Sequence, residues 1–244
     1  RQMCIRDSII NRGLVLFTPL RQSMPPCVPP KLAHKQRSKV NMNREHHRWY
    51  SPTLNRDMQL LVFGHAGAKV IIFPTSKGRY YEWEDRSMMW DALREPLERG
   101  WLQAFCVDAI DEETWYAWWA HPGGRAYRHH LYFQYLHNEV LPFMRWKNQN
   151  PFTMTMGASF GAYHAAGFAL RYPHEVQRMI GICGLYDIRS FTGGYSDEMV
   201  YQYNPMQFVP NEHDWGRLEA MRRQDIILVA GKGCLLYTSP SPRD

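Results

Sequence analysis

Short apolar runs recur through the middle of the chain, and stretches with helical spacing separate most of them. Residues 69–74 (KVIIFP) form a continuous apolar run, which is typical of a strand covered on both faces. Residues 152–156 form an apolar, Thr-bearing run that suits a buried strand, and from residue 160 the pattern changes to helical spacing. By these criteria we predict strands at residues 48–51, 57–64, 69–74, 101–107, 152–156, 176–183 and 225–230.

Helical spacing marks two further stretches. Residues 87–99 are predicted to form a helix closed by Gly100. Residues 124–147 are predicted to form a long helix, which Pro142 is expected to bend or end. The first two strands are expected to pair antiparallel, and residues 184–210 are loop-rich. Strands that alternate with helices indicate an α/β protein with a mostly parallel sheet and helices on both faces.

The basic excess of the chain is confined to its first segment. The formal net charge is +6, yet residues 1–41 hold eight Lys or Arg against the single Asp7, which leaves about −1 for residues 42–233. The body of the protein is near neutral, so we expect no nucleic-acid partner unless residues 1–41 supply the binding. The sequence contains no run of 18 apolar residues, and we expect no membrane span.

The two ends of the chain differ from its middle. Residues 1–41 combine clustered prolines with a basic run, which is typical of a disordered tail. Residues 1–8 (RQMCIRDS) and 234–244 (CLLYTSPSPRD) resemble translated sequencing-adapter read-through. We therefore interpret residues 1–41 as a disordered or non-native extension, residues 42–233 as the folded domain beginning at Met42, and residues 234–244 as a non-native tail.

Three of the five cysteines, Cys4, Cys27 and Cys234, fall in these end segments. Cys106 and Cys183 lie within apolar strand patterns, where a buried thiol is the expected state, and no group of residues has metal-ligand spacing. A reducing compartment fits this pattern, and because no convincing secretory signal is present we expect a cytoplasmic protein.

A motif with defined chemistry follows the strand at residues 152–156. Residues 157–161 read Gly-Ala-Ser-Phe-Gly, the G-x-S-x-G pattern of a nucleophile elbow. In such a turn Ser159 adopts a strained backbone, and Gly157 and Gly161 pass so close to neighbouring chain that a side chain would clash. The serine then lies at a helix N-terminus, where the Phe160 N–H is the natural first donor to an oxyanion. Ser159 is the predicted catalytic nucleophile.

The elbow and its surroundings resemble a known family. The stretches 60–85, 101–122, 157–173 and 181–191 are similar to the esterase family of the α/β-hydrolase superfamily that includes S-formylglutathione hydrolase (esterase D) and the mycolyltransferases. The resemblance implies the α/β-hydrolase fold for residues 42–233 and an oxyanion loop at residues 74–78. By position the second oxyanion donor is the Ser76 N–H, with Thr75 the less favoured choice and a plain turn as the alternative.

Residues near the expected site offer two kinds of substrate contact. Lys77 and Arg79 could meet an anionic group, although solvated charges are common near a loop. Asp111, Glu112 and Glu113 stand beside three tryptophans and could line an acyl or alcohol pocket, or belong to the core or to a lid. The candidate pocket residues are Thr75, Lys77, Trp115, Trp118 and Trp119.

The resemblance also implies a catalytic triad whose acid follows the strand at residues 225–230 and whose histidine follows one more strand. The sequence has no Asp or Glu at the first place and no histidine after His213. His213 and Asp214 precede the strand and are out of order, and His164 is expected to be a helix-surface or packing residue. We therefore expect a domain that is incomplete at its C-terminus and a chain with little or no activity.

These observations together predict a serine carboxylic-ester hydrolase that acts through an acyl-enzyme on Ser159. Its substrate is expected to be a small-molecule ester, and the chemistry requires no cofactor. An acyltransferase on the same fold is the first alternative, because transfer differs from hydrolysis only in which acceptor reaches the acyl-enzyme. A non-catalytic hydrolase-like binding protein is the second.

Overall fold

The computed structural model describes residues 42–231, and our interpretations of residues 1–41 and 234–244, with their three cysteines, lie outside this range. Within it, seven strands form one sheet in the order β1-β2-β4-β3-β5-β6-β7. The strands are β1 (Arg44–Ser51), β2 (Arg56–Phe63), β3 (Ala68–Phe73), β4 (Leu102–Val107), β5 (Thr153–Ala158), β6 (Arg178–Ile182) and β7 (Asp225–Val229).

Helices and helical turns connect most of these strands. They are α1 (Glu82–Asp85), α2 (Arg94–Glu98), η1 (Asp111–Glu113), α3 (Pro122–Tyr135), η2 (Leu136–Val140), α4 (Leu141–Lys147), α5 (Phe160–Arg171), α6 (Arg189–Thr192), α7 (Glu198–Gln202), α8 (Pro205–Phe208), η3 (Val209–Asn211) and α9 (Trp215–Arg222). None of the helices within residues 42–231 is long and apolar enough to cross a bilayer.

The sheet is antiparallel at one side and parallel elsewhere. β2 pairs antiparallel with both β1 and β4, and every other neighbouring pair is parallel. This confirms the predicted mostly parallel sheet with an antiparallel opening. Because the carboxyl ends of parallel strands meet at one edge, the loops that follow β3, β4, β5 and β6 lie along the same edge of the sheet.

Alternate residues of the central strands divide the core into two halves. Ile71 of β3 packs on one face with residues of α3 and α5. Its neighbour Val70 packs on the other face with Trp83 of α1 and Leu97 of α2. Successive side chains of a strand point to opposite faces, so one apolar run serves both halves. Helices therefore cover both faces of the sheet, as the sequence predicts.

The helix predicted at residues 87–99 is wrong in its extent, because only its second half is helical, as α2, and a turn that follows α1 occupies the first half. α1 ends at Asp85, α2 begins at Arg94, and Ser87 between them has a φ of 58°. The Met88 N–H donates to the Trp83 carbonyl and the Ser87 N–H to the Glu84 carbonyl. This pair of bonds closes a helix at a left-handed residue, a conformation that apolar spacing does not reveal.

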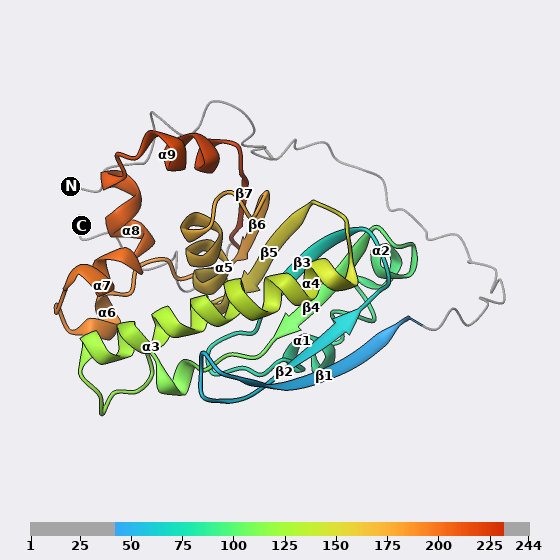
Figure 1. Ribbon diagram of the computed structural model, residues 1–244, viewed down its shortest axis with the longest axis horizontal. Coiled ribbons are helices and arrows are strands. Elements are labelled where there is room, and N and C mark those ends of the chain that lie inside the picture. The colour runs from blue at the N-terminus through green and yellow to red at the C-terminus, as the bar shows by residue number, and fades with distance from the viewer. Residues whose placement is uncertain (1–41, 232–244) are drawn as a thin grey trace, which may run out of the picture. The chain divides into compact units, whose positions relative to one another are not determined.

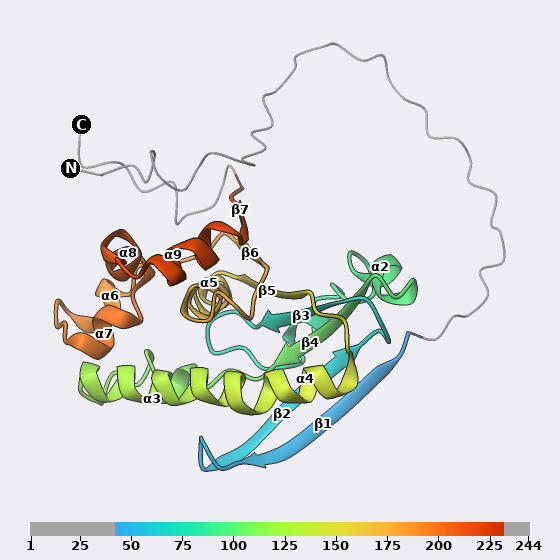
Figure 2. The ribbon, with the colours of Figure 1, turned by 45° about the horizontal axis from the view of Figure 1, so that its top comes forward.

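The long helix predicted at residues 124–147 begins earlier, at Pro122, and passes through Pro142 to Lys147. Figures 1 and 2 show α3 and α4 as one continuous rod along the sheet. The π-helical turn η2 lies directly before α4. A π-turn is one of the irregularities by which a helix takes up a disturbance such as a proline. Pro142 therefore does not end the helix.

Candidate functional site

Ser159 stands alone between β5 and α5, on a tight strand-to-helix turn. Its φ of 55° and ψ of −120° lie in a region that non-glycine residues rarely adopt. Two backbone hydrogen bonds hold the turn: the Ser159 N–H donates to the Ile182 carbonyl, and the Leu185 N–H donates to the Ser159 carbonyl. The backbone is thus strained at the predicted nucleophile and is fixed by the end of β6 and the chain that follows it.

The two glycines of the motif mark close contacts of main chain with main chain. A Cβ on Gly157 would lie 2.2 Å from the Gly161 carbonyl oxygen. A Cβ on Gly161 would lie 2.3 Å from the Pro74 carbonyl oxygen. Both distances are well below van der Waals contact, so glycine is required on steric grounds. The second contact also places the start of α5 directly against the loop that follows β3.

The backbone N–H groups of that loop differ in their partners. The Thr75 N–H donates to Glu82 Oε2 at 2.7 Å, and the Lys77 N–H donates to Asp111 Oδ2 at 2.8 Å. The Gly78 N–H donates to the Thr75 carbonyl. For the Ser76 N–H we find no acceptor among residues 42–231, and Ser76 is exposed. Ser76 therefore offers a loop amide that a ligand could use, whereas the Thr75 N–H is already bonded.

Asp111 joins this loop to the elbow helix. Its Oδ1 lies 2.8 Å from His164 Nε2, and both side chains are 1% exposed. His164 belongs to α5 and is fully buried. The centroid of its ring lies 5.0 Å from that of the Phe160 ring. The surface alternative for His164 is therefore wrong and the packing alternative is right. Of the alternatives for Asp111, a buried position is the one observed, and its carboxylate anchors the loop.

The two cations near the loop have different environments. The Arg79 guanidinium makes two hydrogen bonds to the buried Asp108 carboxylate, at 2.7 and 3.0 Å, and this interaction raises the pKa of Arg79. The Arg79 guanidinium is thus tied to a buried carboxylate, although its side chain is 43% exposed. The Lys77 ammonium lies 5.3 Å from the centroid of the Tyr116 ring. A cation over an aromatic face is weakly held, so Lys77 is the better placed of the two to meet an anion.

The three candidate tryptophans do not form a common wall. Trp115 is fully buried in the core, which corrects its place among the pocket candidates. Trp118 is 58% exposed and stacks on Phe191, with the ring centroids 5.4 Å apart, while Trp119 is 87% exposed.

Thr75 is tied to Glu82 through its hydroxyl as well as its N–H.

Tyr116 is an aromatic neighbour of the elbow that we did not single out from the sequence. Its ring centroid lies 5.2 Å from that of Phe160 and 5.1 Å from that of Phe191. Burial raises the pKa of Tyr116, and a side-chain hydrogen bond with Ser76 acts in the opposite direction. Its place two residues before Trp118, in the aromatic stretch after β4, was the only signal in the sequence.

The described residues do not bring a histidine to the place that a triad needs. β7 is followed by Ala230 and Gly231, and His213 and Asp214 lie before α9, where Asp214 caps the helix by accepting the Arg217 N–H. No group of three or more His, Cys, Asp or Glu side chains within residues 42–231 is arranged to hold a metal ion.

The two cysteines of the domain differ in burial. Burial raises the pKa of the Cys106 thiol far above its ordinary value, as expected for a strand residue in the core. Cys183 is half-buried and follows the end of β6, so its assignment to the strand is wrong by one residue.

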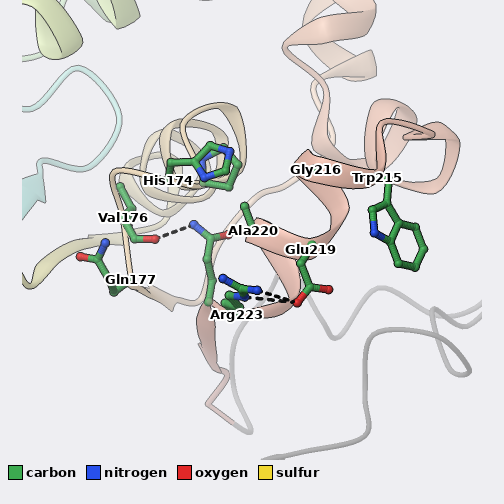
Figure 3. A pocket seen from close by; sticks show the side chains of 10 residues that line it. His174, Val176, Gln177, Trp215, Gly216, Glu219, Ala220 and Arg223 are labelled. Carbon is green, nitrogen blue, oxygen red and sulfur yellow. Dashed lines mark hydrogen bonds and ion pairs between the residues drawn. The ribbon is translucent and has the colours of Figure 1, made fainter.

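A cavity of about 370 Å³ lies elsewhere, between α9 and the segment before β6 (Figure 3). Val176 and Gln177 line it together with Trp215 and Glu219 of α9. Val176 and Gln177 directly precede the amino end of β6, whereas Ser159 follows the carboxyl end of β5. The cavity is therefore separate from the elbow.

Comparison with known proteins places this arrangement in a fold. No family model and no curated protein matches the sequence. An S-formylglutathione hydrolase from Staphylococcus aureus is similar with a TM-score of 0.56 and 14% identity over 79% of this chain and 78% of that chain. This chain has the α/β-hydrolase fold. An S-formylglutathione hydrolase from Agrobacterium tumefaciens is similar with a TM-score of 0.56 and 15% identity over 81% of this chain and 89% of that chain. The fluorophosphonate-binding serine hydrolase FphF of S. aureus is similar with a TM-score of 0.54 and 13% identity over 80% of this chain and 82% of that chain.

At these identities the likeness establishes the α/β-hydrolase fold, and the reaction has to be argued from the site. In this fold the elbow follows β5 and the candidate oxyanion loop follows β3, its direct neighbour in the sheet. The pairing of these two strands explains why residues 76 and 159, far apart in the sequence, belong to one edge of the sheet.

Proposed function

We propose that this protein is a serine carboxylic-ester hydrolase that works through an acyl-enzyme on Ser159. The observation that carries the proposal is the strained turn, with Ser159 at a φ of 55° between β5 and α5. Such strain persists where the surrounding structure over-determines it, and it clusters at active sites. The serine hydrolase and S-formylglutathione hydrolases among the similar structures support the same assignment.

In the proposed reaction the Ser159 hydroxyl oxygen attacks the carbonyl carbon of a small-molecule ester. The N–H groups of Phe160 and Ser76 stabilise the negative charge that develops on the carbonyl oxygen. Collapse of the tetrahedral intermediate expels the alcohol and leaves the acyl group on Ser159. Water then attacks the acyl-enzyme and releases the acid. None of these steps requires a metal or an organic cofactor.

The proton of the Ser159 hydroxyl needs an acceptor, and this decides the expected rate. The sequence has no histidine after His213, and His164 is buried against Asp111. A serine hydroxyl without a base is a weak nucleophile. We therefore expect slow turnover by this chain, with the oxyanion hole as the main remaining contribution. In serine proteases that contribution is about 10³ to 10⁴ over water.

The test compares Ser159→Ala with Ser196→Ala, a change at an exposed serine after α6. With p-nitrophenyl acetate, the unmodified chain and Ser196→Ala are expected to gain one acetyl group, located on Ser159 by peptide mass spectrometry. Ser159→Ala is expected to lose both this acetylation and the hydrolysis above the buffer rate. Equal hydrolysis by the unmodified chain and Ser159→Ala would contradict the proposal and favour a non-catalytic binding role.

The same experiment separates hydrolysis from acyl transfer. If acetyl-Ser159 is formed, its decay is measured in buffer and with added alcohols. Decay that an alcohol does not accelerate supports the hydrolase. Decay that is several-fold faster with an alcohol, with the new ester as product, would favour an acyltransferase.

A further inference from the structure

Two carboxylates hold the loop on either side of Ser76. Glu82 accepts the Thr75 N–H at 2.7 Å, and Asp111 accepts the Lys77 N–H at 2.8 Å. The peptides before and after the Ser76 N–H are thus both fixed by charge-assisted hydrogen bonds, which are shorter and stronger than neutral ones. The loop conformation that leaves the Ser76 N–H without an acceptor among the described residues is therefore imposed from two sides.

Lys77 shows that the loop is held in a conformation it does not prefer. Its φ is 57°, in the left-handed region that a lysine rarely adopts. Such a conformation is strained and persists only where neighbouring groups enforce it. The bond from the Lys77 N–H to Asp111 is the contact that involves this residue's own backbone.

The Asp111 carboxylate is itself oriented by the elbow helix. His164 Nε2 lies 2.8 Å from Asp111 Oδ1, and the exposed fraction of both side chains is 1%. An ionised carboxylate can only accept, so we assign the proton to His164 Nε2, which donates. Asp111 thus uses one oxygen for α5 and the other for the loop. The helix that begins after Ser159 and the loop that carries Ser76 are joined through one side chain.

We propose that Asp111, oriented by His164, is a positioning residue of the oxyanion hole: it holds the Ser76–Lys77 segment so that the Ser76 N–H stays available to the developing oxyanion. This inference rests on the proposed function of Ser159. Asp111 touches neither the substrate nor the reacting atoms. It sets the loop on which the second oxyanion donor lies and ties that loop to the helix that carries the first, Phe160.

The unmodified protein provides the first test. Amide hydrogen exchange is measured residue by residue by NMR at residues 75–77. The Thr75 and Lys77 amides are expected to exchange at least about tenfold more slowly than the Ser76 amide, which corresponds to the net contribution of one hydrogen bond to a charged group. Exchange of Lys77 as fast as that of Ser76 would overturn the proposal, because Asp111 would then not hold the loop.

Paired substitutions at His164 provide the second test. His164→Gln keeps an N–H donor in place of Nε2, whereas His164→Leu removes it. We expect His164→Leu and Asp111→Asn to accelerate Lys77 exchange about tenfold or more, because one of the two contacts of the carboxylate is lost. His164→Gln is expected to restore most of the protection. Equal exchange in the Gln and Leu variants would contradict the role of His164 as the orienting donor.

Thr155→Val is the matched control. The Thr155 hydroxyl donates to the Ala165 carbonyl at 3.0 Å and is fully buried, so its loss weakens the contact of β5 with α5 without touching the loop. Thermal unfolding is recorded for all variants. If Thr155→Val lowers the melting temperature as much as His164→Leu and also accelerates Lys77 exchange equally, the effect is general destabilisation and the proposal fails.

Acetylation of Ser159 by p-nitrophenyl acetate, measured on the same samples, separates this inference from the proposed function. Slower acetylation of His164→Leu than of His164→Gln, at the same ester concentration, supports positioning of the oxyanion hole. If Ser159 is not acetylated in any variant, the proposed function fails, and a Lys77 exchange that still follows Asp111 and His164 shows a purely structural link. If acetylation is equal in both His164 variants while loop exchange differs, the positioning proposal alone is overturned.

Discussion

Gly161 lies where the elbow helix passes the end of β3. A Cβ at this position would be 2.3 Å from the Pro74 carbonyl oxygen and 2.8 Å from that of Phe73. Both contacting atoms belong to the main chain, so they cannot move away from the new methyl group as the end of a flexible side chain could. The contact that requires glycine also places the start of α5 against the main chain of residues 73 and 74, directly before the loop of Ser76.

We expect Gly161→Ala to lower the free energy of unfolding by about 3 kcal/mol, because the methyl group must displace β3 or the helix. Gly124→Ala is the control, since a Cβ there meets nothing within 4 Å and the residue lies in α3. Alanine in a helix is better than glycine, so this variant is expected to gain about 0.5 to 1 kcal/mol. Urea unfolding measures the free energy of unfolding of both variants. An unchanged value for Gly161→Ala would contradict the close contact of the elbow helix with β3.

At the residue scale, the motif predicted what depends on neighbouring residues in the sequence. Gly157, Ser159 and Gly161 could be assigned because the elbow requires these residue types at this spacing. Asp111 and His164 could not, because their importance arises from a contact between residues 53 positions apart. Sequence reasoning placed both residues near the site without identifying the bond between them.

At the element scale, Glu45 links the outer strand β1 to α4. Its Oε2 accepts from the Lys147 ammonium at 2.5 Å and interacts with His47 at 2.8 Å. The hydrogen bond from Lys147 lowers the pKa of Glu45 from 4.5 to about 2. A carboxyl group whose pKa is lower in the folded state stabilises the fold above its unfolded pKa, and this stabilisation is lost as the pH falls through the folded value.

We therefore expect Glu45→Gln to lower the free energy of unfolding at pH 7 by up to about 1 kcal/mol, since the pair is partly exposed and screened by solvent. The difference from the unmodified chain should shrink between pH 4.5 and pH 2, the window given by the shifted pKa. Glu95→Gln, in the exposed pair with Arg99, is the control and should have little effect. A Glu45→Gln difference that persists unchanged at pH 2 would contradict the link.

Element prediction failed where backbone geometry overrides apolar spacing. Residues 87–99 have a helical pattern, yet the positive φ of Ser87 divides them into a turn and α2. The long helix was predicted from residue 124, two residues after its start, and Pro142 was expected to bend or end it. The π-turn that precedes this proline is not visible in the sequence. Periodicity reports burial on one face and says little about where a helix is interrupted.

At the scale of the whole molecule, β7 is the last strand of the sheet and pairs only with β6 among the described residues. All five of its residues are exposed, including four apolar side chains at 40 to 57%. An exposed apolar edge strand is a template for pairing with another chain.

The predicted incompleteness of the domain and its cytoplasmic location both stay predictions.

We expect the protein to self-associate through β7 in a concentration-dependent manner, and Leu228→Lys to reduce this association at least several-fold because a charge on an edge strand opposes pairing. Trp146→Lys, which removes another exposed apolar side chain from α4, is the control. Sedimentation velocity over a concentration series measures both. Equal effects of the two variants would indicate general hydrophobic association and would contradict pairing at the edge.

The sequence by itself predicted the strands, the long helix, the helix after the elbow and the elbow with Ser159, because these follow from periodicity and from residue types at short spacing. The short helices α6, α7 and α8, in a stretch expected to be loop-rich, and α9 were missed. Only the tertiary structure decided which carboxylates reach the loop after β3. β3 and β4 are parallel neighbours, joined by a crossover that contains α1 and α2. Their carboxyl ends therefore lie side by side, and the segment after β4 brings Asp111 to Lys77 and His164. Such contacts depend on sheet order and on the packing of α5, and these arise from the sum of many distant interactions.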